Sequence, residues 1–116
     1  MPDITRIDGN QRRSRMVVHK DVVYLAGQVA DDARGDIAAQ TSEALAKIDD
    51  LLSRAGTSKD NLLSAQIWLA DMADFPGMNA VWDNWVAPDN APTRCCGEVK
   101  LADPAYRVEI VVTAAR

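Results

Sequence analysis

The feature that most constrains the fold is a stripe of apolar residues at helical spacing in the middle of the chain. These residues recur three or four positions apart, so they fall on one face of an α-helix. Gly56 follows the last of them, at the position where many helices end in a left-handed residue. The pattern predicts a helix over residues 37–55 that buries one face. The apolar positions are Ala44, Leu45, Ile48, Leu51, Leu52 and Ala55.

Strand patterns flank this helix on both sides. Residues 16–28 contain two runs of β-branched and aromatic side chains separated by Lys20 and Asp21, which predicts a hairpin with a two-residue turn. Residues 62–70 alternate, which predicts a strand with one buried face. Because a strand, a helix and a strand follow in order, the second and third strands are predicted to run parallel through a right-handed crossover. The buried face of residues 62–70 is predicted to carry Leu63, Ala65, Ile67 and Leu69.

A second helix is predicted to begin near Asp74. The side chain of Asp74 can cap the helix, and Pro76 is tolerated in the first turn. The inner stripe of this helix is predicted to be Phe75, Met78, Trp82 and either Trp85 or Val86.

Two final strands are predicted over residues 93–100 and 106–114. The predicted order is therefore ββαβαββ, an α+β fold in one domain of residues 1–116 with both helices on one face of the sheet. Two helices cover only one side of such a sheet, so the other side must be solvated or covered by another subunit. That other side is expected to include Gln66, Trp68 and Val111.

The charge and the rare residue types exclude several functions. The 116-residue chain has a formal net charge of −4, which repels phosphate backbones. Its one dense basic run, residues 12–15, is smaller than the footprint of a nucleic-acid module and is interpreted as a solvated or intersubunit arm. His19 is the only histidine, so neither a catalytic triad nor a zinc site is expected, and no cofactor or metal is predicted.

The chain is expected to be cytoplasmic, without a membrane partner. No stretch approaches the ~20 apolar residues that a membrane helix needs, and the polar first residues lack the apolar core of a signal peptide. Cys95 and Cys96 are adjacent on a predicted strand, where a disulfide between them would be strained. Reduced thiols in a reducing compartment are the simpler interpretation.

Two ionisable residues near the C-terminus are candidates for binding a ligand and for proton transfer. Arg94 and Glu109 lie in the last two predicted strands, which are expected to pair and so to set a guanidinium near a carboxylate. An arginine can donate two parallel hydrogen bonds to a ligand carboxylate, and a glutamate can relay a proton from a positioned water. The residues alone leave two interpretations open, a site for a small acid and a structural cross-strand ion pair.

The order and spacing of several short blocks resemble the RidA (YjgF) family over essentially the whole chain. Within that family the chain looks closest to the YoaB-like branch, mainly through residues 80–86 and 106–110. The matching blocks are residues 23–28, 68–71, 74–75, 78–79, 92–94 and 108–110, with Gln40, Thr41, Ala44, Leu45, Ile48 and Cys96.

The resemblance implies a chorismate-mutase-like fold with a mixed six-stranded sheet, assembled as a homotrimer with sites between subunits. Archetypal members hydrolyse 2-imino acids to 2-oxo acids and ammonia. By this resemblance Arg94 clamps the substrate carboxylate, Glu109 orients the attacking water, and the main-chain amide of Cys96 lines the pocket. Gly27, Asn79 and Trp85 complete the implied substrate-binding set.

The chain departs from the archetype at two implied pocket positions. Arg13 or a near neighbour stands where archetypal members have a tyrosine, and Ala26 stands where they have a serine. A 2-iminobutanoate/2-iminopropanoate deaminase-like hydrolase is the favoured function. The alternative is a non-catalytic protein of the same fold that binds a 2-oxo or other small carboxylic acid. Ribonuclease activity or nucleic-acid binding is disfavoured by the net charge.

Overall fold

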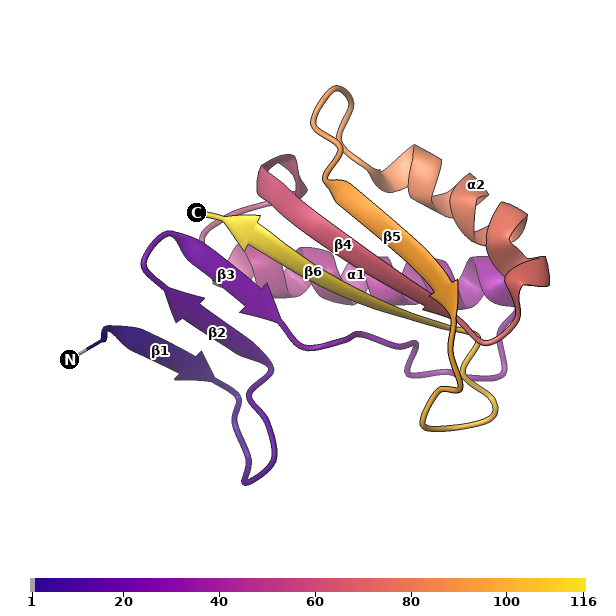
Figure 1. Cartoon of the computed structure of the whole chain (residues 1–116), viewed down its shortest axis with the longest axis horizontal. Helices are drawn as coiled ribbons and strands as arrows, with labels where there is room; N and C mark the ends of the chain where they lie inside the picture. Colours follow the sequence, from indigo (N-terminus) through magenta and orange to yellow (C-terminus); the bar gives the residue numbers. More distant parts are fainter. Residues whose placement is uncertain (1) are drawn as a thin grey trace.

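A six-stranded mixed sheet with two helices on one face makes up the computed structural model, which describes residues 2–116 (Figure 1). The strands are β1 (Ile4–Ile7), β2 (Met16–His19), β3 (Val22–Leu25), β4 (Leu62–Leu69), β5 (Thr93–Glu98) and β6 (Val108–Ala115), and the helices are α1 (Ile37–Arg54) and α2 (Phe75–Trp85). The sheet order is β1-β2-β3-β6-β4-β5, and every neighbouring pair is antiparallel except β4 and β5. This is the α+β fold that the sequence predicts.

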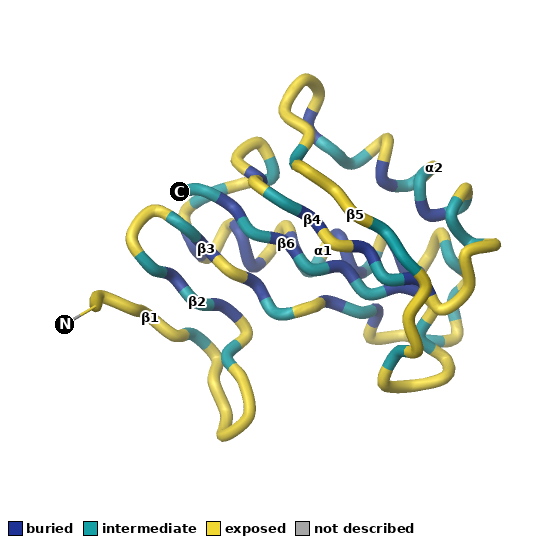
Figure 2. Tube along the Cα trace, in the orientation of Figure 1, coloured by how far each residue is buried: buried dark blue, intermediate teal, exposed yellow. Residues whose placement is uncertain are grey.

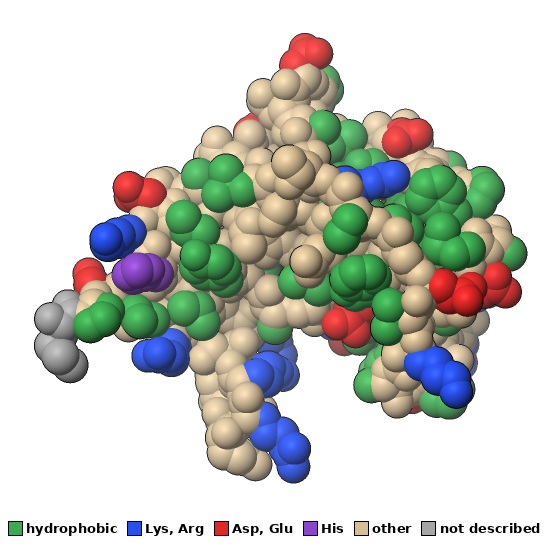
Figure 3. Space-filling model, in the orientation of Figure 1, with side chains coloured by type: hydrophobic (Ala, Val, Ile, Leu, Met, Phe, Trp, Pro, Cys, Tyr) green, Lys and Arg blue, Asp and Glu red, His purple; other side chains and the backbone are tan. Residues whose placement is uncertain are grey.

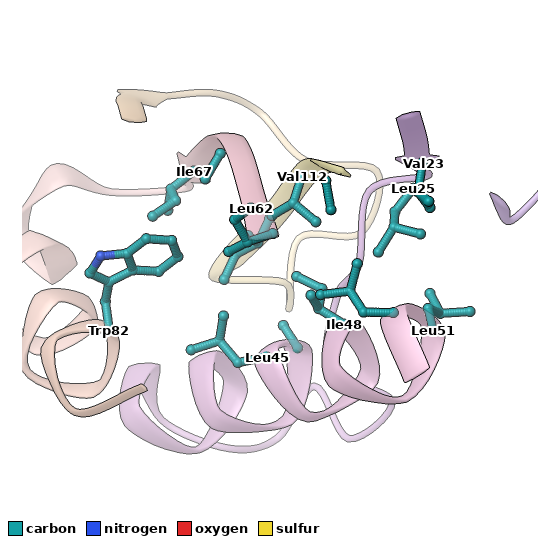
Figure 4. Close-up of a cluster of buried hydrophobic side chains, with 14 of the residues drawn as sticks. Val23, Leu25, Leu45, Ile48, Leu51, Leu62, Ile67, Trp82 and Val112 are labelled. Atoms are coloured by element: carbon teal, nitrogen blue, oxygen red, sulfur yellow. The ribbon is translucent and has the colours of Figure 1, made fainter. Parts of the chain in front are cut away.

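Helix α1 confirms the helix predicted over residues 37–55. The carboxylate of Asp36 accepts a hydrogen bond from the backbone N–H of Ala39 at 2.8 Å and so caps the N-terminus. Gly56 has a φ of +78°, the left-handed conformation expected after the last turn. The apolar stripe of α1 faces the sheet (Figure 4). Among the labelled side chains, Leu45, Ile48 and Leu51 come from α1, and Val23, Leu25, Leu62, Ile67 and Val112 come from the strands.

Helix α2 begins where predicted, but its cap differs. Asp74 makes no capping hydrogen bond through its side chain, because its own backbone is already helical (φ −83°, ψ −1°) at the end of a short 3₁₀ turn. A capping residue needs an extended backbone, so the predicted side-chain cap was wrong. The carboxylate instead lies 3.4 Å from Nε of Arg107. The predicted inner stripe is confirmed: Met78 and Trp82 are buried, and Phe75, Trp85 and Val86 pack partly buried against the core.

Strand β6 lies at the centre of the sheet, which bears on two predictions: that β3 and β4 run parallel, and that the last two strands pair. Both β3 and β4 pair antiparallel with β6, so they run parallel to each other as predicted, but β6 lies between them. Strand β4 in turn separates β5 from β6. The strands that carry Arg94 and Glu109 therefore do not pair, and the expectation that they do was wrong. Pairing between segments far apart in sequence leaves no local pattern that could reveal it.

Two local features were also missed. Strand β1 is an edge strand with three of its four residues exposed, so it shows no alternation to predict it from. In β4 a register irregularity between Leu62 and Ser64 buries Leu62 and leaves Leu63 46% exposed, so the predicted burial of Leu63 was wrong. Beyond this point the predicted buried face holds, with Ala65, Ile67 and Leu69 all in the core.

The side of the sheet that no helix covers is partly apolar. Along β6 buried and half-buried residues alternate strictly, because every second side chain lies under the helices (Figure 2). Gln66, Trp68 and Val111 lie on the uncovered side as predicted, and Tyr24 is 46% exposed there. Figure 3 views this side and shows hydrophobic side chains scattered over it. Within residues 2–116, neither helix has the length and apolar character to span a membrane.

Gln40 ties the segment before β6 to helix α1. The residue is 0% exposed. Its side-chain N–H groups donate to the carbonyl oxygens of Ala33, Gly35 and Ala105 at 3.1, 3.0 and 3.1 Å. Its side-chain oxygen accepts from the backbone N–H of Arg107 at 2.9 Å. The two N–H bonds of the amide are shared among three carbonyl oxygens, so one buried amide contacts four backbone groups and fixes where β6 begins.

Replacing Gln40→Leu is expected to lower the free energy of unfolding by about 2–4 kcal/mol. A leucine of similar size leaves several backbone groups without partners, each at a cost of about 1–3 kcal/mol when buried. Urea unfolding at one fixed protein concentration, followed by tryptophan fluorescence, measures the change. The matched control is Gln11→Leu at an exposed loop position, which is expected to change stability by less than about 0.5 kcal/mol. Equal stability of the two variants would contradict this role for Gln40.

Candidate functional site

Arg94 lies on the edge strand β5 and reaches over α2. In the strand register it faces the same side as Ala65, which is the side that the helices cover. Its Nη1 donates to Oδ1 of Asn79 at 2.8 Å, and its guanidinium carbon lies 5.9 Å from the ring centre of Phe75 and 5.5 Å from that of Trp82. Cation–π contacts of this kind hold a guanidinium in place. Arg94 remains exposed and forms no ion pair within residues 2–116, so it keeps N–H groups for a ligand.

The sequence contained a signal for this arrangement. Phe75, Asn79 and Trp82 are spaced four and then three residues apart, so they share one face of α2. Trp82 was predicted only as a core residue. The structure gives it a second contact, under the guanidinium of Arg94.

Cys96 lies two residues beyond Arg94 and faces the same side, half-buried against the core. Burial raises the pKa of the Cys96 thiol, and the nearby positive charge of Arg94 offsets only part of this shift. The thiol is therefore protonated at neutral pH and is a poor nucleophile. This fits the expectation that Cys96 contributes its backbone and its packing rather than its sulfur.

Glu109 lies on β6 beside Gly27. It pairs with Trp68 in the register and so faces the uncovered side of the sheet. Next to it, Gln28 and Ile110 exchange two backbone hydrogen bonds at 2.9 and 3.0 Å, which hold the two segments together. A side-chain carbon at position 27 would lie only 2.9 Å from Cδ of Glu109 and closer still to its Oε2. A glycine at position 27 therefore leaves the space that the carboxylate occupies.

A small hollow of about 140 Å³ is lined by Gly27, although not by Glu109. Ala26, which by the family resemblance stands where archetypal members have a serine, lines the hollow, and so does Arg13; neither side chain carries a hydroxyl group. The full lining is Arg13, Arg15, Ala26, Gly27, Gln28, Val29 and Lys47.

The structure thus brings together two pairs of predicted site residues but does not unite them within one chain. Arg94 contacts Asn79 on the helix-covered side, and Glu109 lies against Gly27 on the uncovered side. Because β4 separates their strands and they face opposite sides, Arg94 and Glu109 cannot form a cross-strand ion pair. That interpretation of the sequence is excluded.

Other residues that could bear chemistry lie apart from both pairs. Trp85 donates through Nε1 to Asp49 at 2.9 Å and lines a separate hollow of about 330 Å³ between α1 and α2, and its ring lies 5.3 Å from that of Trp82. His19 lies on β2 near one end of the sheet (Figure 3). Within the described part of the chain, no three His, Cys, Asp or Glu residues are grouped to hold a metal ion.

Comparison with known proteins decides the family. The sequence profile described as Endoribonuclease L-PSP matches residues 4–116. The chain belongs to this family, also called RidA or YjgF. RutC family protein YoaB of Escherichia coli K12 is 42% identical over 112 residues, 97% of each chain. The crystal structure of a YjgF-family protein from Neisseria meningitidis superposes with a TM-score of 0.93 at 42% identity, over 98% of this chain and 95% of that one.

A functionally described relative is more distant. The 3-aminoacrylate deaminase RutC of Acinetobacter baylyi is 35% identical over 100 residues, which cover 81% of this RidA-family chain and 79% of the relative. The resemblance read from the sequence, including its YoaB-like character, is thereby confirmed.

Replacing Gly27→Ala is expected to displace the carboxylate of Glu109 by about 1 Å while leaving the fold intact. The added carbon overlaps the end of a side chain that can rotate away to restore normal contact distances. Crystal structures of the two proteins would measure the shift. Gly9→Ala is the control, because its added carbon meets Oγ of Ser14 at an ordinary 3.4 Å. An unmoved Glu109 in the Gly27→Ala protein would show that Gly27 does not make room for it.

Proposed function

We propose that this RidA-family chain hydrolyses 2-imino acids to 2-oxo acids and ammonia, and that it does so as a homotrimer with sites between subunits. The observation that carries the proposal is the division of the candidate site. An unpaired guanidinium, Arg94, and a carboxylate held over Gly27, Glu109, lie on opposite sides of one sheet. Each chain then holds two half-sites, and a neighbouring chain completes each of them.

The uncovered side of the sheet supports assembly. Val111 and Trp68 are only partly buried there and Tyr24 is 46% exposed, so a second chain could remove their apolar surface from water. Contacts between unlike surfaces of identical chains form closed rings when the rotation between neighbours allows it. A three-membered ring would place Arg94 of one chain near Glu109 of the next at three equivalent sites.

Arg94 would bind the carboxylate of the substrate. Its planar guanidinium can donate two parallel hydrogen bonds, and Asn79 together with the rings of Phe75 and Trp82 fixes its orientation. Two such bonds at about 1.5 kcal/mol each amount to about 3 kcal/mol, enough to hold a small acid in register. The backbone of Cys96 adjoins the same place, and Trp85 acts through Trp82, against which it packs.

Glu109 would place and activate the water. As the water oxygen bonds to the imine carbon, the carboxylate accepts a proton from it, and the C=N double bond becomes a C–N single bond. Glu109 then returns this proton to the nitrogen. Glu109 then takes the proton that remains on the new hydroxyl group and passes it to the nitrogen, so that the C–N bond breaks, ammonia leaves and the oxygen forms the C=O bond of the 2-oxo acid. Water and imine are the only reactants.

Two further observations agree with this proposal. The deaminase RutC, at 35% identity, shows that a relative removes an amino group from a small unsaturated acid. Cys95 and Cys96 are both free thiols, which favours a reducing compartment and hence action in the cytoplasm.

The alternative function is a non-catalytic protein that binds a small carboxylic acid at Arg94. The observation that favours it is the lack of a hydroxyl at Arg13 and Ala26, which line the hollow at Gly27. This alternative predicts that 2-oxo acids bind but that imines break down no faster than in buffer.

Release of a 2-oxo acid from freshly generated imine is expected to be faster with wild-type protein than with buffer. Arg94→Ala is expected to lower kcat/KM at least about 100-fold, the equivalent of about 3 kcal/mol. Arg94→Lys is expected to lose most of the activity because lysine lacks the planar fork. The control is Arg34→Ala, since Arg34 is exposed and pairs only with its neighbour Asp32. Equal rates in all samples would leave the binding function as the explanation.

Mixing inactive subunits is expected to restore activity. Arg94→Ala and Glu109→Gln chains, each inactive alone, should form mixed rings in which some sites combine an intact Arg94 with an intact Glu109. Unfolding and refolding them together, followed by the same assay, tests this, and light scattering should give about three times the 12.6 kDa chain mass. Inactive mixtures of trimeric protein would contradict a site shared between chains.

A further inference from the structure

The hollow at Gly27 is basic. Arg13, Arg15 and Lys47 line it together with Gly27, although the chain as a whole carries a net charge of −4. Figure 3 shows Lys and Arg side chains along the projecting loop that joins β1 to β2. Positive charge is therefore gathered around Gly27, the residue against which Glu109 lies, and not only at Arg94.

Two of these three cations lack a direct partner. Lys47 donates to the carbonyl of Val29 at 2.9 Å and to the carboxylate of Asp31 at 2.8 Å, so its charge is balanced. Among residues 2–116, the guanidinium of Arg13 donates only to the backbone oxygen of Asp8, at 3.4 Å. Neither Arg13 nor Arg15 forms an ion pair within residues 2–116, although Arg15 adds to the field that lowers the pKa of Asp31. A hollow lined by unpaired guanidinium groups favours an anion.

The loop holds Arg13 in a defined position. The side chain of Asn10 accepts from the backbone N–H groups of Arg12 and Arg13 at 2.8 and 3.0 Å, and the backbone N–H of Asn10 donates to the oxygen of Arg13 at 2.9 Å. Asp8, in the same loop, forms an ion pair with Arg54 of α1 at 2.9 Å. The backbone at Arg13 is therefore tied to the rest of the protein, as a binding residue requires.

We propose that Arg13, assisted by Arg15, binds a second carboxylate, so that the site selects 2-imino acids with an acidic side chain. This inference rests on the proposed function, in which the first carboxylate lies at Arg94 of the neighbouring chain and the reacting carbon lies near Glu109. Gly27 lines the hollow and also borders Glu109, so a short side chain on a ligand bound near Glu109 would reach the hollow past Gly27. A volume of about 140 Å³ accommodates a carboxylate on a few carbon atoms.

The test measures binding and turnover for a matched pair of ligands. Titration calorimetry with 2-oxoglutarate and 2-oxobutanoate reports binding without chemistry, and the imines of glutamate and 2-aminobutyrate, made by an amino-acid oxidase, report kcat/KM. Wild-type protein is expected to prefer the acidic ligand by about tenfold, the equivalent of one charge-assisted hydrogen bond. Arg13→Ala should remove this preference and change values for the neutral ligand less than about twofold.

The matched control is Arg12→Ala, which removes the same charge from the same loop but from a residue that does not line the hollow. It should leave the preference unchanged. If Arg12→Ala and Arg13→Ala lower the preference for the acidic ligand equally, the effect is general electrostatics and the inference is overturned. The inference would also be overturned if Arg13→Ala weakened binding and turnover of both ligands equally, or of neither. Competition by inorganic phosphate as strong as that by 2-oxoglutarate would overturn the dicarboxylate assignment in favour of a general anion site.

The outcomes separate this inference from the proposed function. If no imine is hydrolysed but 2-oxoglutarate binds in a way that depends on Arg13, the deaminase proposal fails and the second subsite stands. If acidic and neutral imines are hydrolysed equally well and Arg13→Ala has no effect, the deaminase proposal stands and the second subsite fails.

Discussion

Burial of one side of the sheet under two helices is the constraint on which the rest of the structure depends. Strand β6 lies at the centre, and Val108, Ile110, Val112 and Ala114 all point into the core. The residues between them must then point the other way, so the place of Glu109 follows from the packing of its neighbours. A slip of one residue would bury Glu109 and expose Ile110, and this cost fixes the register. The carboxylate that is proposed to activate water is thereby held in a fixed position.

The same constraint explains which parts of the fold could be predicted from the sequence. The stripe of α1 and the alternation of residues 62–70 are local patterns created by one-sided burial, and both were read correctly apart from Leu63. Strand order is not local. The insertion of β6 between β3 and β4 depends on contacts across most of the chain, and no sequence pattern near Glu109 indicates it. Strand β1 was not predicted for a different reason: an exposed edge strand needs no apolar pattern.

For the candidate site, residue types were easier to predict than their arrangement. Arg94 and Glu109 were identified from their chemistry and from the family resemblance, but the sequence suggested that they were neighbours. The structure separates them by a strand and by the thickness of the sheet. This separation excludes a cross-strand ion pair as the explanation for the two residues. An exposed arginine that hydrogen bonds to Asn79, without a carboxylate partner in residues 2–116, is not there to neutralise Glu109. A neighbouring chain is the economical way to bring the two groups together.

The departures from the archetypal pocket can then be understood together. By the family resemblance, Arg13 or a near neighbour stands where archetypal members have a tyrosine and Ala26 stands where they have a serine, so two hydroxyl groups of the archetype are absent. The same difference introduces a guanidinium that the folded chain leaves without a carboxylate partner among residues 2–116. An acidic group on the ligand would compensate Arg13 and would also supply hydrogen-bond acceptors where the hydroxyls are missing. Under the proposed function, loss of the hydroxyls and gain of the cation would be one change of specificity, with Arg94 and Glu109 serving the chemistry proposed for the site.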